Sequence, residues 1–105
     1  MENKGDSRYL LESMNIFKAL GNDTRLKIVV SIYDEGKSVS KICEEIHMTQ
    51  SAVSHQLQIL KLYHIVKDVR RSKEVYYYLH DEHVKNIIEQ AFSHTSHTSL
   101  WKSNL

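Results

Sequence analysis

Imidazole side chains are the most distinctive chemical feature of this 105-residue sequence, which contains seven histidines. Four of them lie in the last quarter of the chain, beginning with the segment His80 to His83, which also contains an aspartate and a glutamate. Imidazole and carboxylate groups together form ligand sets that suit zinc, cobalt or nickel. The candidate metal ligands are therefore Asp81, His83, His94 and His97.

The spacing of these candidate ligands decides whether one chain can hold the metal. Asp81 and His94 are 13 positions apart, which in an α-helix is roughly 20 Å, whereas the bonds from zinc to its ligands are about 2 Å long. One helix therefore cannot close the site. Two antiparallel copies of the helix can close it. In such a pair, residues that face each other across the interface have a nearly constant sum of residue numbers. That sum is 178 for Asp81 with His97 and 177 for His83 with His94.

We therefore predict two equivalent metal sites in a twofold homodimer, each combining Asp81 and His83 of one protomer with His94 and His97 of the other. Each residue alone has a simpler interpretation, because aspartate near a helix N-terminus and histidine near a C-terminus interact favourably with the helix dipole. The paired spacing is what favours a metal site for the set. His80, which precedes the pattern, and Glu82, which interrupts it, are spectators or additional ligands.

Periodic hydrophobicity indicates the elements that must position these residues. It predicts helices over residues 8–20, about 22–34, 38–46 and 50–63, a hairpin with strands 65–69 and 74–79, and a last helix from about residue 81, with Asp81 at its N-cap. The hairpin tip, Arg70 to Lys73, lacks an Asn-Gly or Asp-Gly pair, so we expect a loop longer than two residues. Residues 1–6 and 98–105 are expected to be disordered. The last helix carries an apolar stripe that we expect to form the dimer contact: Val84, Ile87, Ile88, Ala91 and Phe92.

The order of these elements predicts a mainly α protein with a β-hairpin wing, a single winged helix-turn-helix domain spanning residues 1–105. Thr49 is a favourable N-cap for the second helix of the helix-turn-helix. A domain of this length has a limited core of its own, so we expect a homodimer through the N- and C-terminal helices.

The helix over 50–63 and the hairpin carry side chains suited to double-stranded DNA. The helix leaves amide, hydroxyl and imidazole groups for base edges in the major groove, namely Gln50, Ser51, Ser54, His55 and Gln58. The hairpin supplies cations for phosphates, namely Lys67, Arg70, Arg71 and Lys73. A solvated polar face is the alternative for either element alone. A helix-turn-helix followed by a basic hairpin is the more specific combination.

The sequence resembles the ArsR/SmtB family of metal-responsive repressors in three segments: FKALGNDTRLKIV from Phe17, TQSAVSHQLQILK from Thr49, and VYYYLHDEHV at the end of the hairpin. The resemblance spans roughly residues 10–97, and Ser51 to Leu57 is its most specific part. It implies a dimeric winged helix that represses an operon for metal efflux or sequestration and leaves its operator when metal binds. The D-x-H…H-x-x-H pattern of the family's last helix falls on Asp81, His83, His94 and His97.

A different metal site of that family uses cysteines on the helix before the recognition helix. The resemblance puts Ser38 and Ser40 at those positions, which argues against sensing arsenite, lead or cadmium through thiolates. Four nitrogen and oxygen ligands favour zinc, with cobalt or nickel as alternatives. His64 lies at the junction of the recognition helix and the wing and is a candidate allosteric relay between the metal site and the DNA-binding surface. If His94 binds metal through one ring nitrogen, its second ring nitrogen needs a hydrogen-bond partner.

Composition limits the other functions. The net charge is only +1, so contact with nucleic acid must come from locally clustered cations. No apolar run of about 18 residues and no signal peptide occur, which predicts a cytoplasmic protein without a membrane span. A metallohydrolase would need an open coordination position, and no H-E-x-x-H motif is present, so we expect no enzyme. The remaining alternatives are a winged-helix regulator that responds to oxidation at Cys43 or to a small ligand, and a constitutive regulator.

Overall fold

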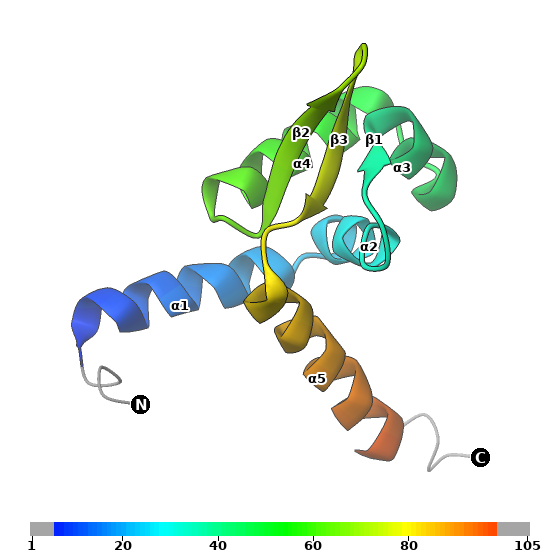
Figure 1. The fold of residues 1–105 in the computed structure, drawn as a ribbon. Coiled ribbons are helices and arrows are strands. Elements are labelled where there is room, and N and C mark those ends of the chain that lie inside the picture. The colour runs from blue at the N-terminus through cyan, green and yellow to red at the C-terminus, as the bar shows by residue number, and fades with distance from the viewer. Residues whose placement is uncertain (1–5, 99–105) are drawn as a thin grey trace.

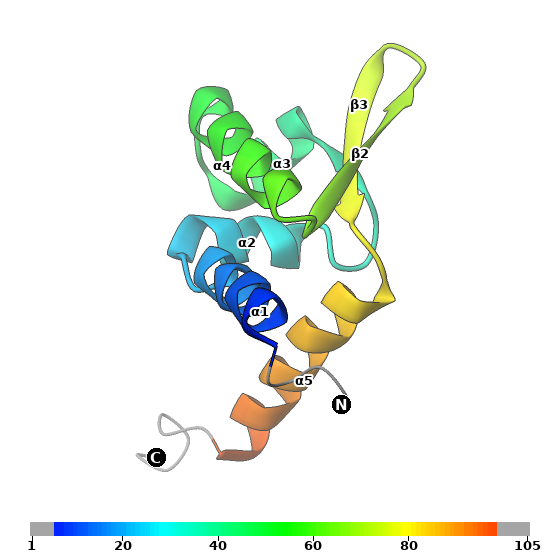
Figure 2. The same ribbon diagram turned by 90° about the vertical axis from the view of Figure 1, so that its left-hand side faces the viewer.

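The structure is a computed structural model that describes residues 6–98. Its elements are α1 (Ser7–Leu20), α2 (Asp23–Ser31), β1 (Lys37–Ser38), α3 (Val39–Ile46), α4 (Gln50–Leu62), β2 (Val66–Arg71), β3 (Glu74–Leu79) and α5 (Glu82–Thr98). Helices α2 to α4 and the sheet form one body, from which α1 and α5 project in different directions (Figures 1 and 2). The predicted winged helix-turn-helix, mainly α with a β-hairpin wing, is confirmed.

The core lies where α2, α3 and α4 meet the base of the sheet. Its fully buried side chains come from all of these elements: Ile28, Val29, Ile42, Val53, Leu57, Leu60, Ile65 and Val66. Burial of each such side chain contributes roughly 1.5–3 kcal/mol of folding free energy. Helix α1 packs on this core through its last turns, where Ala19 and Leu20 are buried.

Polar residues at the start of each helix explain where the helices begin. The side chain of Asn22 accepts a hydrogen bond from the Arg25 amide at 2.9 Å, and that of Thr49 accepts one from the Ala52 amide at 3.2 Å. The predicted N-cap at Thr49 is confirmed. His47 ends α3 in the left-handed conformation with φ of 57°, which allows the tight turn into α4.

The three-stranded sheet has the order β1-β3-β2 and is antiparallel throughout. The expected long loop at the hairpin tip is wrong, because Arg71 pairs directly with Glu74 and only Ser72 and Lys73 lie between the strands. Ser72 has a φ of 60°, the conformation that glycine or asparagine usually supplies in such turns. Strand β1 was not predicted from the sequence, because two residues carry no alternation.

Three further boundaries differ from expectation. Helix α2 ends at Ser31 rather than near residue 34. Asp6, assigned to a disordered end, caps α1 by accepting a hydrogen bond from the Arg8 amide at 2.9 Å, and α5 continues to Thr98. The rest of the two expected disordered segments, 1–5 and 99–105, lies outside the described residues. Within residues 6–98, no helix is both long and apolar enough to cross a membrane.

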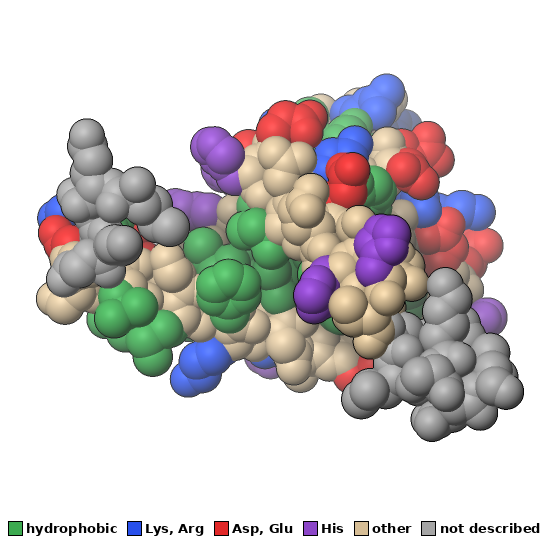
Figure 3. All heavy atoms as spheres, turned by 90° about the horizontal axis from the view of Figure 1, so that it is seen from below, with side chains coloured by type: hydrophobic (Ala, Val, Ile, Leu, Met, Phe, Trp, Pro, Cys, Tyr) green, Lys and Arg blue, Asp and Glu red, His purple; other side chains and the backbone are tan. Residues whose placement is uncertain are grey.

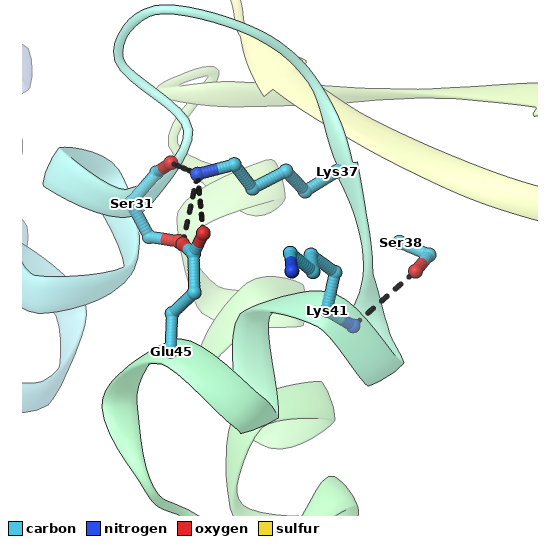
Figure 4. A network of polar contacts seen from close by, with 5 residues as sticks. All are labelled: Ser31, Lys37, Ser38, Lys41 and Glu45. Atoms are coloured by element: carbon cyan, nitrogen blue, oxygen red, sulfur yellow. Dashed lines mark hydrogen bonds and ion pairs between the residues drawn. The ribbon is translucent and has the colours of Figure 1, made fainter.

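A polar network joins α2, β1 and α3 at the base of the wing (Figure 4). The Lys37 ammonium donates to both carboxylate oxygens of Glu45, at 2.9 and 2.8 Å, and to the backbone carbonyl of Ser31. The Ser31 hydroxyl donates to the same carboxylate at 2.5 Å. The hydrogen bonds from Lys37, and then that from Ser31, lower the pKa of Glu45. The network therefore depends on an ionised Glu45.

We expect Glu45→Gln to make stability less dependent on acid pH. A carboxyl group whose pKa is lowered by folding stabilises the fold above its unfolded-state pKa, about 4.3, and loses that contribution as pH falls through its folded-state pKa. The urea midpoint of Glu45→Gln should therefore fall less than that of the wild type between about pH 7 and about pH 3. Glu44→Gln shows whether removing any α3 carboxylate has this effect. An equal fall in Glu45→Gln and wild type would contradict the assignment.

Candidate DNA interface and metal-ligand positions

Helix α4 presents its polar side chains away from the core. Val53, Leu57 and Leu60 are completely buried. On its other faces, Ser54 is half-buried and the remaining candidates are exposed: Gln50, Ser51, His55 and Gln58. The wing, defined here as residues 66–79, rises beside α4 (Figure 2). The arrangement can offer short polar groups to base edges and wing cations to the flanking phosphates.

Arg25 holds α4 in place, a role that the sequence analysis did not find. Its Nε donates to the Ala19 carbonyl at 2.8 Å, and its guanidinium also donates to the Gln56 side-chain oxygen at 2.9 Å. One side chain therefore connects the end of α1 to α4. The signal in the sequence is only an arginine in an amphipathic helix, and its partner is 31 residues away, so periodicity could not reveal it.

The wing cations are exposed but do not share one face. Lys61 of α4 forms a 2.8 Å ion pair with Asp68, and this ion pair lowers the pKa of Asp68. The side of β2 that carries Asp68 therefore faces α4, and because side chains alternate along a strand, Arg70 lies on that side. Lys67 and Arg71 lie on the opposite side. Lys73 occupies the turn.

Two of the candidate metal ligands lie together at the start of α5. One carboxylate oxygen of Asp81 accepts a hydrogen bond from the Val84 amide at 3.0 Å and so caps the helix, as the sequence predicted. The other oxygen lies 3.5 Å from Nδ1 of His83, whose side chain is 92% exposed. The Val84 hydrogen bond lowers the pKa of Asp81. The fold therefore favours the ionised form of this carboxylate.

The other two candidates, His94 and His97, are exposed in the last turns of α5. Among residues 6–98, no three histidine, cysteine, aspartate or glutamate side chains of the single chain are arranged to hold a metal ion. Any site that uses all four α5 ligands must therefore include a second chain.

A groove of about 690 Å³ opens beside Asp81 and His83, between α1, the end of α4 and the start of α5. His64 and His80 line it too, with stacked rings whose centroids are 5.5 Å apart. Nδ1 of His80 is buried without a hydrogen-bond partner within the described part of the chain. The structure thus places His64 beside the residue that precedes Asp81.

The residues of the apolar stripe on α5 differ in burial. Val84 and Ile88 are only 6% and 4% exposed and belong to the protomer's own core. The expectation that the whole stripe forms a dimer contact is therefore wrong, because the first turns of α5 pack against the protomer's own core. Ile87 is half-buried, and Ala91 and Phe92 are exposed in the protomer.

Comparisons with known proteins identify the chain. The model of the bacterial regulatory protein arsR family matches residues 22–67. The HTH-type transcriptional regulator NmtR of Mycobacterium tuberculosis is 32% identical over 99 residues, which are 94% of this chain and 82% of NmtR. The chain belongs to the ArsR family. The cadmium resistance transcriptional regulatory protein CadC homolog of Staphylococcus aureus is 40% identical over 80% of this ArsR-family chain and 70% of the homolog.

Two solved structures agree with this fold. The solution structure of apo-NmtR has a TM-score of 0.77 at 33% identity, covering 90% of this chain and 80% of that one. Reduced HlyU from Vibrio cholerae has a TM-score of 0.74 at 27% identity, covering 80% of this chain and 88% of that one. The chain is therefore a DNA-binding transcriptional regulator of the ArsR family and not an enzyme.

The capping and ligand roles of Asp81 can be separated by substitution. Asparagine is as good an N-cap as aspartate, whereas alanine at an N-cap costs about 1 kcal/mol of stability. With a chelator present, we expect Asp81→Ala to lower the free energy of unfolding by about that amount and Asp81→Asn to leave it nearly unchanged. Urea unfolding measures both. Equal destabilisation by the two variants would contradict the capping role.

Proposed function

We propose that this ArsR-family regulator is a homodimeric repressor that binds a palindromic operator and releases it on binding Zn(II), with Co(II) or Ni(II) as alternatives. The metal would be held at two sites between the α5 helices, and its binding would derepress genes for metal efflux or sequestration. The observation that carries the proposal is the position of the ligand pairs. Exposed side chains of the types that bind metal ions lie at both ends of α5, and one chain cannot bring them together.

Exposed apolar side chains on α1 support a dimer. They are large residues between 42% and 63% exposed: Tyr9, Leu10, Leu11, Met14 and Phe17. Figure 3 shows hydrophobic side chains gathered on this face of the molecule, with histidines beside them. Large contiguous apolar patches on a soluble chain indicate an interaction surface, and a second copy of α1 and α5 would cover this one.

The donor set fits zinc. Asp81 and His83 open onto the groove between α1 and α5, and the end of the partner's α5 would bring His94 and His97 to it. Each site would then have one carboxylate and three imidazole ligands, a set that zinc binds tetrahedrally. When bound, the ion would act as a crosslink between protomers. The chain's own residues would supply the negative charge of Asp81 and the lone pairs of neutral imidazoles.

The connection between metal and DNA follows from chain order. Leu79 ends the wing, and Asp81 follows it after one residue. A crosslink that fixes α5 against its partner would therefore constrain the wing and, through the two protomers, the spacing of the recognition helices, which an operator fixes at about 34 Å. We assign the relay role to His64, which stacks on His80 and so connects the ligand segment to the end of α4. Metal and operator would lower each other's affinity by the same factor.

Oxidation is the alternative signal, and the similarity to reduced HlyU favours it as a second candidate. The one cysteine, Cys43, is half-buried against the core on α3. A disulfide within the chain would need a second cysteine. A redox response would therefore need oxidation of this one thiol or a bond between chains, and Cys43→Ser would abolish it without changing a response to metal.

Metal should weaken operator binding. The probe is a duplex enriched from a random-sequence pool by repeated selection with the metal-free wild-type protein. We expect saturating zinc to raise the Kd of the dimer for this duplex by a factor between about 5 and about 150. The double variant His94→Ala/His97→Ala should bind the duplex like the metal-free wild type and should not respond to zinc.

Thr95→Ala, in the same turns of α5, controls for changes at the end of the helix and should keep the zinc response. An identical Kd with and without zinc for the wild type would remove the coupling. A zinc response that persists in the double-histidine variant would remove the α5 site.

A further inference from the structure

The tyrosines of β3 divide between the two faces of the wing. Tyr77 is 8% exposed and packs in the core, so Tyr76 and Tyr78 project from the opposite face. Arg71 lies across both of them. Its guanidinium carbon is 5.0 Å from the centroid of the Tyr76 ring, and its guanidinium donates a hydrogen bond to the Tyr78 hydroxyl at 2.8 Å. The side chain of Arg71 is therefore held at two points.

The Tyr78 ring also packs closely against the loop that contains Gly36. A Cβ atom built on Gly36 would lie 2.2 Å from this ring, so the loop between α2 and β1 touches it closely and tolerates only glycine there without a shift. The same strand is paired on both sides, with Tyr78 opposite Lys67 of β2 and Tyr76 opposite Ser38 of β1. The position of Arg71 is thus set by the body of the domain and not by the wing tip alone.

We propose that Tyr76 and Tyr78 are positioning residues that pre-order Arg71 for a phosphate of the operator backbone. This inference rests on the proposed contact between the wing and DNA. It adds that the side chain of Arg71 is already ordered before DNA binds. A guanidinium has five N–H donors, so the hydrogen bond to Tyr78 leaves others for a phosphate. A side chain that is already ordered loses less conformational entropy on binding.

Arg70 supplies a matched comparison within the same strand. It is exposed and carries the same charge, and among residues 6–98 its side chain has no hydrogen bond, ion pair or ring contact. It also lies on the other face of β2. Binding must therefore order Arg70, whereas Arg71 is ordered beforehand. The two arginines should depend differently on the Tyr78 hydroxyl.

The test measures Kd against salt concentration for the selected duplex, without metal. Arg71→Ala should weaken binding and make the slope of log K against log salt shallower by about 0.9, the loss of one phosphate contact. Tyr78→Phe keeps the ring against Gly36 and removes only the hydroxyl. It should weaken binding about threefold, the cost of ordering one long side chain, and leave the slope unchanged. Tyr76→Leu should behave in the same way.

The decisive comparison is a double-mutant cycle. In the Arg71→Ala protein, Tyr78→Phe should not weaken DNA binding any further. In the Arg70→Ala protein, Tyr78→Phe should still weaken DNA binding about threefold, as it does in the wild type. If Tyr78→Phe still weakens DNA binding in the Arg71→Ala protein, or does not weaken it in the wild type, this inference is wrong. Neither result would contradict the proposed contact between the wing and DNA. If Arg71→Ala changes neither affinity nor slope, the proposed wing contact fails with it. The urea midpoint of each variant establishes that it is folded.

Discussion

An α-helix advances only about 1.5 Å per residue, and this separates Asp81 from His94 by about 20 Å along α5. No rotamer change can shorten that distance to the few ångströms that a metal ion requires. The helix also remains continuous from Glu82 to Thr98, so it cannot fold back on itself. In the proposed function the candidate ligand pairs would therefore be halves of a site, and the oligomeric state would be part of the coordination chemistry.

The rest of the molecule is consistent with that constraint. Helices α1 and α5 leave the body in different directions (Figures 1 and 2) and carry exposed apolar side chains such as Phe17 and Phe92, which are 63% and 49% exposed. The helix-turn-helix packs around a buried core that lies within the protomer. Because α5 follows the wing directly, a crosslink at its first residues would act on the DNA-binding surface through the shortest stretch of chain available.

Local features of the sequence predicted most of the fold. Thr49 and Asp81 act as the predicted caps, and the buried row of Val53, Leu57 and Leu60 orients the recognition helix as its periodicity indicated. The hairpin tip was missed because Ser72 adopts a left-handed conformation without the glycine or asparagine that usually marks one.

Contacts between distant segments could not be predicted. The Arg25–Gln56 hydrogen bond and the packing of Gly36 on Tyr78 join residues 31 and 42 positions apart in the chain, and no periodicity encodes either. The α5 stripe shows the same limit. Its spacing indicates an apolar face, but only the packing of the first turns of α5 decides that Val84 and Ile88 belong to the protomer's own core. The prediction that one chain cannot bring the four candidate ligands together rests, in contrast, on helix geometry alone, and the described residues agree with it.

Subunit mixing tests the shared site most directly. One subunit would carry Asp81→Asn and His83→Ala, and the other His94→Ala and His97→Ala, so neither homodimer could assemble a complete set of ligands. In the mixed dimer, one site loses all four ligands and the other keeps all four. The account predicts negligible tight zinc binding by either homodimer and about one zinc ion per mixed dimer, against about two for the wild type. Mixed dimers that bind no more zinc than the variant homodimers would contradict it.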